Sequence, residues 1–280
     1  MREINVNKIK NLVARLCIEA NINLRPDIYR ALRRAVKREK KKSAKRLLEV
    51  LVKNAEIARR EARPICQDTG IVSVYVRMGQ KVRLVGGDLV QAINKGVAEG
   101  YKKGLLRKSV VKSPLLRVNT CTNAPAIIYT EVVKGSGLEL TVIPKGFGSE
   151  NKGAVRMLNP TEGEREIISF VLEVVKAAGP DACPPYIIGV GLGGTLDKAA
   201  SLAKEALAAP LERSSTKRYL RRLERNLLDK VNKLGVGPMG LGGRATALGV
   251  KVLEYPTHIA GLPVAVNVGC HATRSARRAL

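Results

Sequence analysis

A thiol, an amide, a carboxylate and a hydroxyl occupy four consecutive positions of the short segment RPICQDTG (63–70). Cys66 can act as a nucleophile or as a metal ligand, and Asp68 can accept a proton or polarise a hydroxyl group. A proline near the start of the segment and a glycine at its end predict a tight loop. The loop is therefore a candidate for covalent, metal or acid–base chemistry.

Five cysteines are spread along the chain: Cys17, Cys66, Cys121, Cys183 and Cys270. Cys183 in GPDACPPY and Cys270 in NVGCHAT resemble Cys66 in setting, because each lies in a segment marked by Pro or Gly and not on an apolar stripe. Cys17 recurs with Val13 at helical spacing and is predicted to be a core residue. An odd number of cysteines and the absence of a secretory signal argue against structural disulfides.

The three loop cysteines leave two interpretations open. They have no CxxC spacing, so they could be unrelated thiols in separate loops. If folding brings them together, three thiolates suit an iron–sulfur cluster better than a structural zinc site, which usually takes four protein ligands. A [4Fe–4S] cluster held by three cysteines would keep one iron open, and that iron could act as a Lewis acid on a substrate oxygen.

The charge of the chain favours an anionic partner, because fifty Lys and Arg residues against twenty-four Asp and Glu give a net charge of +26. Nucleic acid, an acidic subunit and small polycarboxylates all fit this excess. The most basic run, 33–47, is predicted to be a solvated helix surface, and it contains no aromatic side chain on which bases could stack. No window approaches the roughly 18 apolar residues of a membrane span, so a cytoplasmic protein is expected.

The elements that must position these residues divide the chain into two parts. Residues 4–62 are predicted to be helical almost throughout, with a second helix opening at Pro26 and a third from about 43 to 62. Strands and helices alternate afterwards. Strands are predicted at 71–78, 187–195 and 263–269, with a hairpin of 125–133 and 137–144 around KGSG; helices are predicted from Asp88, over 161–180, from Thr195 and over 211–235. The expected fold class is α+β (mixed α/β): a helical N-terminal subdomain, 1–62, and an α/β cluster-binding subdomain, 63–280, in one compact unit without a clear linker.

Local signals define some of the element ends. Asp88 is predicted to cap the helix that follows it. Thr161 and Glu164 have the spacing of a capping box, and Gly179 is predicted to end the same helix. The sequence GLGG occurs at 191–194 and again at 240–243, and either close packing or the binding of anions by backbone N–H groups would explain it.

Five motifs occur in one order along almost the whole chain: RPICQDTG (63–70), NTCTNAP (119–125), PKGFGSENK (144–152), CPPYIIGVGLGGT (183–195) and PTHIAGLPVAVNVGCHATR (256–274). Together they resemble the α subunit, or N-terminal half, of the class I fumarases and the related tartrate dehydratases. The resemblance runs from about residue 4 to residue 280. It implies an oxygen-sensitive hydro-lyase that depends on a [4Fe–4S] cluster.

The resemblance also implies roles for individual residues. Cys66, Cys183 and Cys270 match the three cluster ligands, whereas Cys121 matches no ligand and is predicted to be a bystander. His271, directly after a predicted ligand, is expected either to tune the cluster by a hydrogen bond or to have a structural role.

Substrate contacts are implied for residues beside the predicted ligands and in two other motifs. Asp68 is the candidate for the catalytic proton relay, directly or through a neighbouring hydroxyl group. The predicted substrate-binding residues are Gln67, Arg107, Gly148 and His258.

The predicted function is the reversible hydration of fumarate to malate, a reaction of the tricarboxylic acid cycle, with the open iron as Lewis acid. An L-tartrate dehydratase α subunit is the alternative, and a basic nucleic-acid-binding protein is a distant one. Because single-chain relatives continue beyond the third cysteine, a separate β subunit is expected, in an α2β2 assembly that is active only when both subunits are present. The other expected partner is a small dicarboxylate substrate, and neither nucleic acid nor a membrane is expected.

Overall fold

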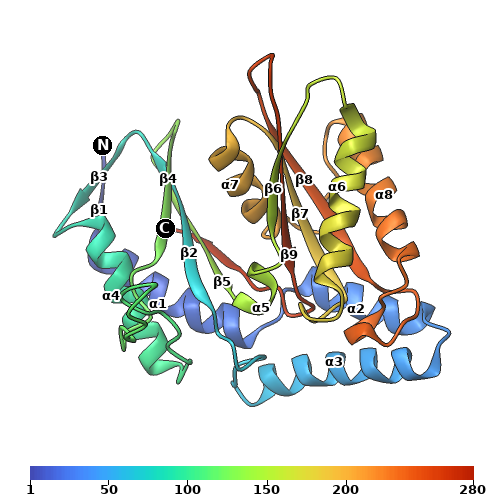
Figure 1. The fold of residues 1–280 in the computed structure, drawn as a ribbon. Coiled ribbons are helices and arrows are strands. Elements are labelled where there is room, and N and C mark those ends of the chain that lie inside the picture. The colour runs from blue at the N-terminus through green and yellow to red at the C-terminus, as the bar shows by residue number, and fades with distance from the viewer. The chain divides into compact units, whose positions relative to one another are not determined.

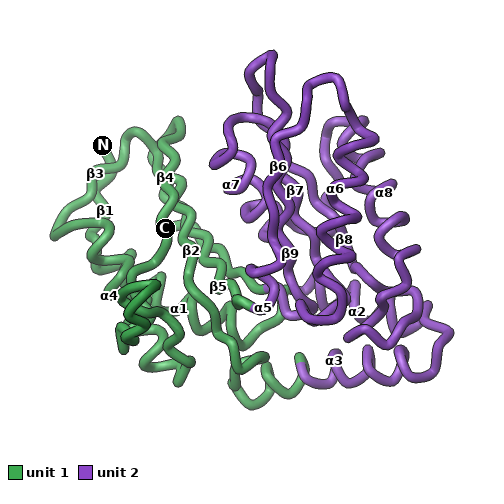
Figure 2. Tube along the Cα trace, viewed as in Figure 1, with its two compact units in different colours: residues 1–25, 55–147, 274–280 green, residues 26–54, 148–273 purple.

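The computed structural model describes residues 1–280, which form two compact units (Figure 2). Unit 1 comprises residues 1–25, 55–147 and 274–280, and unit 2 comprises residues 26–54 and 148–273. The predicted helical region does fold into helices: α1 (Val6–Ile22), α2 (Pro26–Arg38) and α3 (Lys42–Arg60). These helices do not form a subdomain of their own, however, because α2 and most of α3 belong to unit 2. The expected division at residue 62 therefore does not coincide with the boundary between the units.

Unit 1 is built around a four-stranded sheet with the order β10-β5-β2-β4 (Figure 1). Its strands are β2 (Ile71–Gly79), β4 (Ile127–Val133), β5 (Leu138–Lys145) and β10 (Ala276–Ala279). A separate parallel pair consists of β1 (Arg2–Asn5) and β3 (Val82–Val85). The core of unit 1 lies between the four-stranded sheet and α1, which packs on α4 (Leu89–Lys103).

The helix pair of unit 1 forms as its sequence predicts. The Asp88 carboxylate accepts a hydrogen bond from the Gln91 N–H at 2.7 Å, which confirms the predicted N-cap of α4. Gly96 and Gly100 lie on the face of α4 that meets α1. A Cβ atom at either position would come within 2.7 Å of a backbone oxygen of α1, so the absence of side chains allows this close packing.

The predicted hairpin of β4 and β5 is wrong. The two strands do not pair with each other; both pair with β2, which lies between them, parallel to β4 and antiparallel to β5. The KGSG connection instead passes over the end of β2, where the Gly79 N–H donates to the Gly137 carbonyl at 2.8 Å. A side chain at Gly79 would collide with the Gly135 oxygen at 2.5 Å, so this crossing requires glycine. The largely buried β2 gains ladder hydrogen bonds on both edges in this arrangement.

Unit 2 has a three-layer arrangement around a sheet with the order β6-β9-β7-β8 (Figure 1). Its strands are β6 (Ala154–Leu158), β7 (Tyr186–Gly193), β8 (Ala247–Tyr255) and β9 (Leu262–Gly269). One face carries α7 (Leu196–Ala206), and the other carries α6 (Gly163–Ala178) and α8 (Arg218–Lys233). The short α5 (Phe147–Glu150) and the 3₁₀ turn η1 (Pro238–Gly240) complete the elements of the chain.

The glycines of β7 are explained by packing. A Cβ atom at Gly189 would lie 2.1 Å from the Ala203 oxygen, and one at Gly191 would lie 2.0 Å from the Ala199 oxygen. Both oxygens belong to α7, so these glycines allow the helix to lie directly on the strand. Of the two explanations left open for the first GLGG segment, close packing therefore accounts for Gly191.

Other local predictions are corrected. The capping box at Thr161 does not form: α6 is capped by Glu162 without a side-chain hydrogen bond, although the helix does end at Gly179, as predicted. The helix predicted over 211–235 is shorter, because α8 begins only at Arg218. Five strands were not predicted: β1, β3, β6, β8 and β10. The α+β fold class is confirmed.

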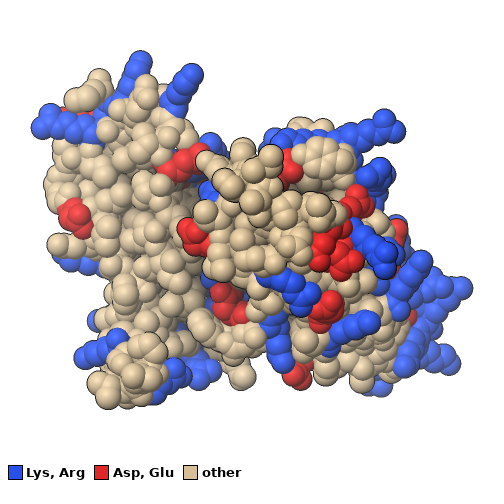
Figure 3. Space-filling model, turned by 45° about the horizontal axis from the view of Figure 1, so that its top comes forward, with Lys and Arg blue, Asp and Glu red and all other residues tan.

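Cationic side chains are prominent on the face drawn in Figure 3, where Lys and Arg exceed Asp and Glu. On α8 a hollow of about 460 Å³ is lined by Arg218, Tyr219, Arg222 and Arg225. Every helix of the structure is too short or too polar to cross a membrane.

Candidate metal centre

The Cys66 loop leads into β2 of unit 1, and hydrogen bonds to the backbone of the loop hold it in place. The Tyr101 hydroxyl of α4 donates to the carbonyl oxygens of Thr69 and Gly70 at 2.5 and 3.0 Å. Burial raises the pKa of Tyr101, so the phenol stays protonated and keeps its role as donor. Cys66 itself is half-buried, and the following Gln67 side chain is exposed. The loop thus presents its reactive side chains from a rigid backbone.

The Asp68 carboxylate is oriented by two backbone donors within unit 1. Its Oδ1 accepts from the Gly70 N–H at 3.0 Å, and its Oδ2 accepts from the Phe147 N–H at 2.8 Å. A Cβ atom at Gly146 would lie only 2.9 Å from Oδ2, so the glycine leaves the space that the carboxylate fills. The side chain of Asp68 is half-buried, with its direction set before any substrate binds.

Two further loops meet the Cys66 loop at this end of the sheet. The Thr69 hydroxyl donates to the Arg107 carbonyl at 2.7 Å, and the Arg107 side chain is exposed. The buried Asn123 bridges the loops: its Nδ2 donates to the Gly70 carbonyl at 3.1 Å, and its Oδ1 accepts from the Ser109 N–H at 2.7 Å. The structure therefore brings the segments of Gln67, Asp68 and Arg107 together. The bridging role of Asn123 was not predicted from the sequence, although Asn123 is part of the motif NTCTNAP (119–125).

Replacing Asn123 by alanine is expected to destabilise the chain by about 2–4 kcal/mol. Two hydrogen bonds to buried or half-buried groups are lost, at roughly 1 kcal/mol or more each, and alanine tolerates the positive φ of 63° less well than asparagine. Urea unfolding measures the change. Asn123→Gly removes the bonds without the backbone strain and is expected to cost less, and the exposed Asn151→Ala serves as control. Wild-type stability of Asn123→Ala would contradict the bridging role.

Unit 2 brings two of the predicted ligands together. Cys183 precedes β7 and Cys270 follows the antiparallel β9, so both lie at the same end of the sheet. The backbone N–H of His271 donates to the Cys183 carbonyl at 3.2 Å, and the His271 Nδ1 lies 3.3 Å from the same oxygen. Burial first, and then the nearby Cys183 and Cys270, raise the pKa of the Tyr186 hydroxyl. Through these two contacts His271 links the Cys183 and Cys270 loops to each other, which corresponds to the structural one of its two predicted roles.

The third predicted ligand, Cys66, belongs to unit 1. Neither unit by itself gathers three His, Cys, Asp or Glu side chains that could hold a metal ion. The chemistry of the donor set nevertheless fits an iron–sulfur cluster, since Cys183 is exposed and Cys66 and Cys270 are half-buried, all in loops at strand ends. Cys17 differs: it is fully buried, and burial raises the pKa of its thiol to about 12. It is a core residue, as predicted.

His258 is not brought to the pair of cysteines in unit 2. Its exposed loop is attached to the turn after β7, where the Gly194 N–H donates to the Pro256 carbonyl at 3.2 Å and the Thr257 hydroxyl donates to the Gly194 carbonyl at 2.9 Å. This is the far end of the sheet from Cys183 and Cys270. The eight residues of β7 span roughly 23 Å at about 3.3 Å per residue.

Gly148 lies in α5 with an exposed backbone. The nearest atom to a Cβ placed there would be the Asp181 oxygen at 4.0 Å, so the space beside this backbone is free. The segment is anchored through Glu150, which pairs with Lys204 at 2.5 Å and accepts from the Asn267 amide at 3.1 Å. Gly148 is thus an accessible backbone position on a fixed segment.

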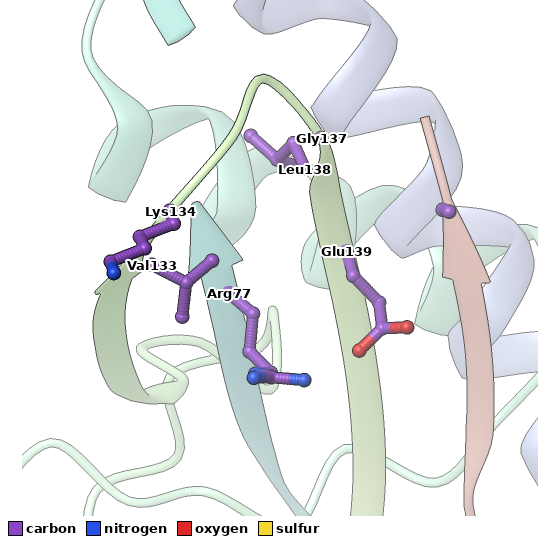
Figure 4. A pocket seen from close by; sticks show the side chains of 7 residues that line it. Arg77, Val133, Lys134, Gly137, Leu138 and Glu139 are labelled. Atoms are coloured by element: carbon purple, nitrogen blue, oxygen red, sulfur yellow. The ribbon is translucent and has the colours of Figure 1, made fainter. Parts of the chain in front are cut away.

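A hollow of about 250 Å³ in unit 1 is not the candidate site. It lies along the later part of β2 and the KGSG connection, and is lined by Arg77, Val133, Lys134, Gly137, Leu138, Glu139 and Ala279 (Figure 4). It contains no thiol and none of the predicted site residues. The hydrogen-bonded loops around Asp68 offer more chemistry than this open hollow.

Comparisons with known proteins found a family model and several relatives that match almost the whole chain. A family model described as fumarate hydratase (fumerase) matches residues 10–279. A protein of Methanocaldococcus jannaschii named putative L(+)-tartrate dehydratase subunit alpha is 38% identical over 275 residues, which cover 96% of each chain. The L(+)-tartrate dehydratase subunit alpha of Escherichia coli strain UTI89 is 29% identical over 96% of this chain and 89% of its own, and that of strain K12 is 28% identical over 272 residues.

Proposed function

The chain belongs to the fumarate hydratase (fumerase) family, and from this premise we propose that it is the α subunit of an L(+)-tartrate dehydratase that depends on a [4Fe–4S] cluster. We base the choice of substrate on the 38% identity, over 96% of both chains, to a protein with the name of that subunit. Hydration of fumarate to malate, the first expectation from sequence, becomes the second candidate and is favoured by the name of the family model. Both reactions belong to one class, the hydro-lyases.

We propose Cys66, Cys183 and Cys270 as the cluster ligands. The link between the Cys183 and Cys270 loops supports two of them. The third, Cys66, is proposed from its place in the motif RPICQDTG, in the loop of unit 1 that Arg274 hydrogen-bonds at the Asp68 carbonyl.

When bound, the cluster would supply an open iron that acts as a Lewis acid toward the substrate hydroxyl. The residues of the chain do the rest. Asp68, held by two N–H donors, accepts the proton or polarises a hydroxyl group that does so. The exposed guanidinium of Arg107 binds a substrate carboxylate, and Gln67 and the Gly148 backbone donate N–H groups to oxygens on which negative charge develops.

The predicted substrate-binding role of His258 has to be assigned to a different site. A residue roughly 23 Å from the Cys183 and Cys270 loops cannot contact a substrate bound beside them in the same chain. We therefore propose that His258 contributes to the site of a neighbouring chain in the assembly. The exposure of its loop, including Ile259 at 90%, is consistent with contact to another chain.

The relatives are named as alpha subunits, and this naming supports a separate partner subunit for this chain, proposed as β in an α2β2 assembly. An acidic β subunit would offset part of the charge of +26.

The test of function is a comparison of kcat/KM on L-tartrate, malate and fumarate, with the chain prepared anaerobically together with its partner. We expect the highest kcat/KM on L-tartrate and no turnover by this chain alone. A preference for malate and fumarate would establish the second candidate in its place. Turnover by the isolated chain would contradict the requirement for a β subunit.

A further inference from the structure

Arg274 is a buried arginine without a carboxylate partner. Arg274 is only 4% exposed, and its guanidinium forms no ion pair. Its neighbours Arg277 and Arg278, by contrast, are exposed and pair with Glu139 and Glu19. A buried charge is costly unless its hydrogen bonds are well made. The contacts of Arg274 should therefore reveal why the cation is there.

Two of the guanidinium nitrogens bind the Cys66 loop and its support. Nη2 donates to the Asp68 carbonyl at 2.7 Å, and Nη1 donates to the Asn21 Oδ1 at 3.1 Å. Asn21 is fully buried in α1, and its own carbonyl accepts from the Ile65 N–H at 2.9 Å, one residue before Cys66. The Arg274 Nε is buried without a partner. Arg274 thus supports the loop on both sides of Cys66, directly at Asp68 and through Asn21 at Ile65.

The guanidinium also lies beside the Asp68 carboxylate without binding its oxygens. A Cβ atom at Gly146 would lie 2.9 Å from the Asp68 Oδ2 and 3.6 Å from the Arg274 Nη2, so the two groups flank the same glycine. Both carboxylate oxygens keep their backbone N–H donors and remaining lone pairs.

We propose that Arg274 is a positioning residue: it clamps the backbone of Asp68 and thereby keeps the carboxylate correctly directed toward its two N–H donors. The placement of the loop is a property of the chain itself, whereas its catalytic consequence rests on the proposed function. The Cys270 motif thus supplies both a predicted ligand and, four positions later, the residue that orders the Cys66 loop.

Amide hydrogen exchange on the free chain tests the clamp. The Gly70 and Phe147 N–H groups donate to the Asp68 carboxylate, so Arg274→Gln is expected to accelerate their exchange by about tenfold or more, the loss expected for a charged hydrogen bond. Amides in the centre of β7, in the other unit, should exchange as in wild type. Arg274→Lys, which keeps the charge but cannot bridge both acceptors, should accelerate the same two amides. Arg277→Gln is the matched control and should accelerate neither.

The clamp is overturned if Arg274→Gln is folded and its Gly70 and Phe147 amides exchange at wild-type rates. A second arm separates it from the proposed function. With the cluster and the partner subunit, Arg274→Gln should retain its cluster absorbance and lose kcat about tenfold or more, with little change in KM. If wild type binds no iron while Arg274→Gln accelerates the two amides selectively, the proposed function fails and the clamp stands. If the wild type is active and the Gly70 and Phe147 amides of Arg274→Gln exchange at wild-type rates, the proposed function stands and the clamp fails.

Discussion

Replacing Cys66, Cys183 or Cys270 by serine is expected to abolish binding of the iron–sulfur cluster, whereas Cys121→Ser is expected to leave it intact. Iron in these clusters is held by thiolates, and a serine hydroxyl, which stays protonated at neutral pH, does not replace them. Anaerobic reconstitution followed by iron and sulfide analysis measures the loss. About four irons per chain in wild type should fall to a small fraction in each of the three variants.

The structure makes these substitutions informative, because none of them should unfold the chain. The Cys183 and Cys270 loops are joined through backbone groups and the His271 ring, and the thiol groups take no part in these bonds. The exposed Cys121 is the suitable control, since it also lies in a loop of reactive appearance. The fully buried Cys17 is not, because a hydroxyl in the core has its own cost. A cluster retained by Cys183→Ser, or lost by Cys121→Ser, would refute the ligand set.

Local signals predicted the helices, and non-local pairing explains the main error in the sheets. The apolar periodicity of α1 and the cap at Asp88 depend on residues within a few positions of each other, so both could be inferred from sequence. Whether β4 and β5 pair with each other or with a third strand depends on β2, some fifty positions earlier. Short strands such as β3 and β10 have four residues each, too few for a pattern of alternation to stand out.

Sequence reasoning proposed site residues that lie together in one short segment, and it missed residues whose roles depend on contacts between distant segments. The crowding of Cys66 and Asp68 in one loop was visible in the sequence. The roles of Asn123 and Arg274 were not, because each acts on that loop from a distant part of the chain: Asn123 lies more than fifty positions away and Arg274 more than two hundred.

His258 illustrates the opposite limit of sequence reasoning. In the motif PTHIAGLPVAVNVGCHATR it stands only twelve positions before Cys270, which suggests one site. The intervening residues form the extended strand β9, and this strand carries the chain from one end of the sheet to the other. Closeness in sequence along a strand is therefore separation in space.

The second large effect concerns Asp68→Asn, which is expected to keep the cluster and to reduce turnover by about 10²–10⁴, the usual contribution of a general acid or base. The amide is close to the carboxylate in shape, so Cys66 should stay in place as a ligand. The variant cannot accept a proton at neutral pH. Iron content, cluster absorbance and kcat, measured on one preparation with the partner subunit, check the separation of the two properties.

Asp68→Asn also has a structural cost that follows from its contacts. The carboxylate accepts one N–H on each oxygen, from Gly70 and from Phe147, whereas an amide offers one oxygen and turns an NH₂ group toward the other donor. One half-buried N–H loses its partner, at about 1–3 kcal/mol. Asp88→Asn is the matched control, because asparagine caps a helix about as well as aspartate and should change neither stability nor turnover. If Asp68→Asn, loaded with its cluster, turned over like wild type, Asp68 would be a purely structural acceptor, and the proton would have to be taken by another group.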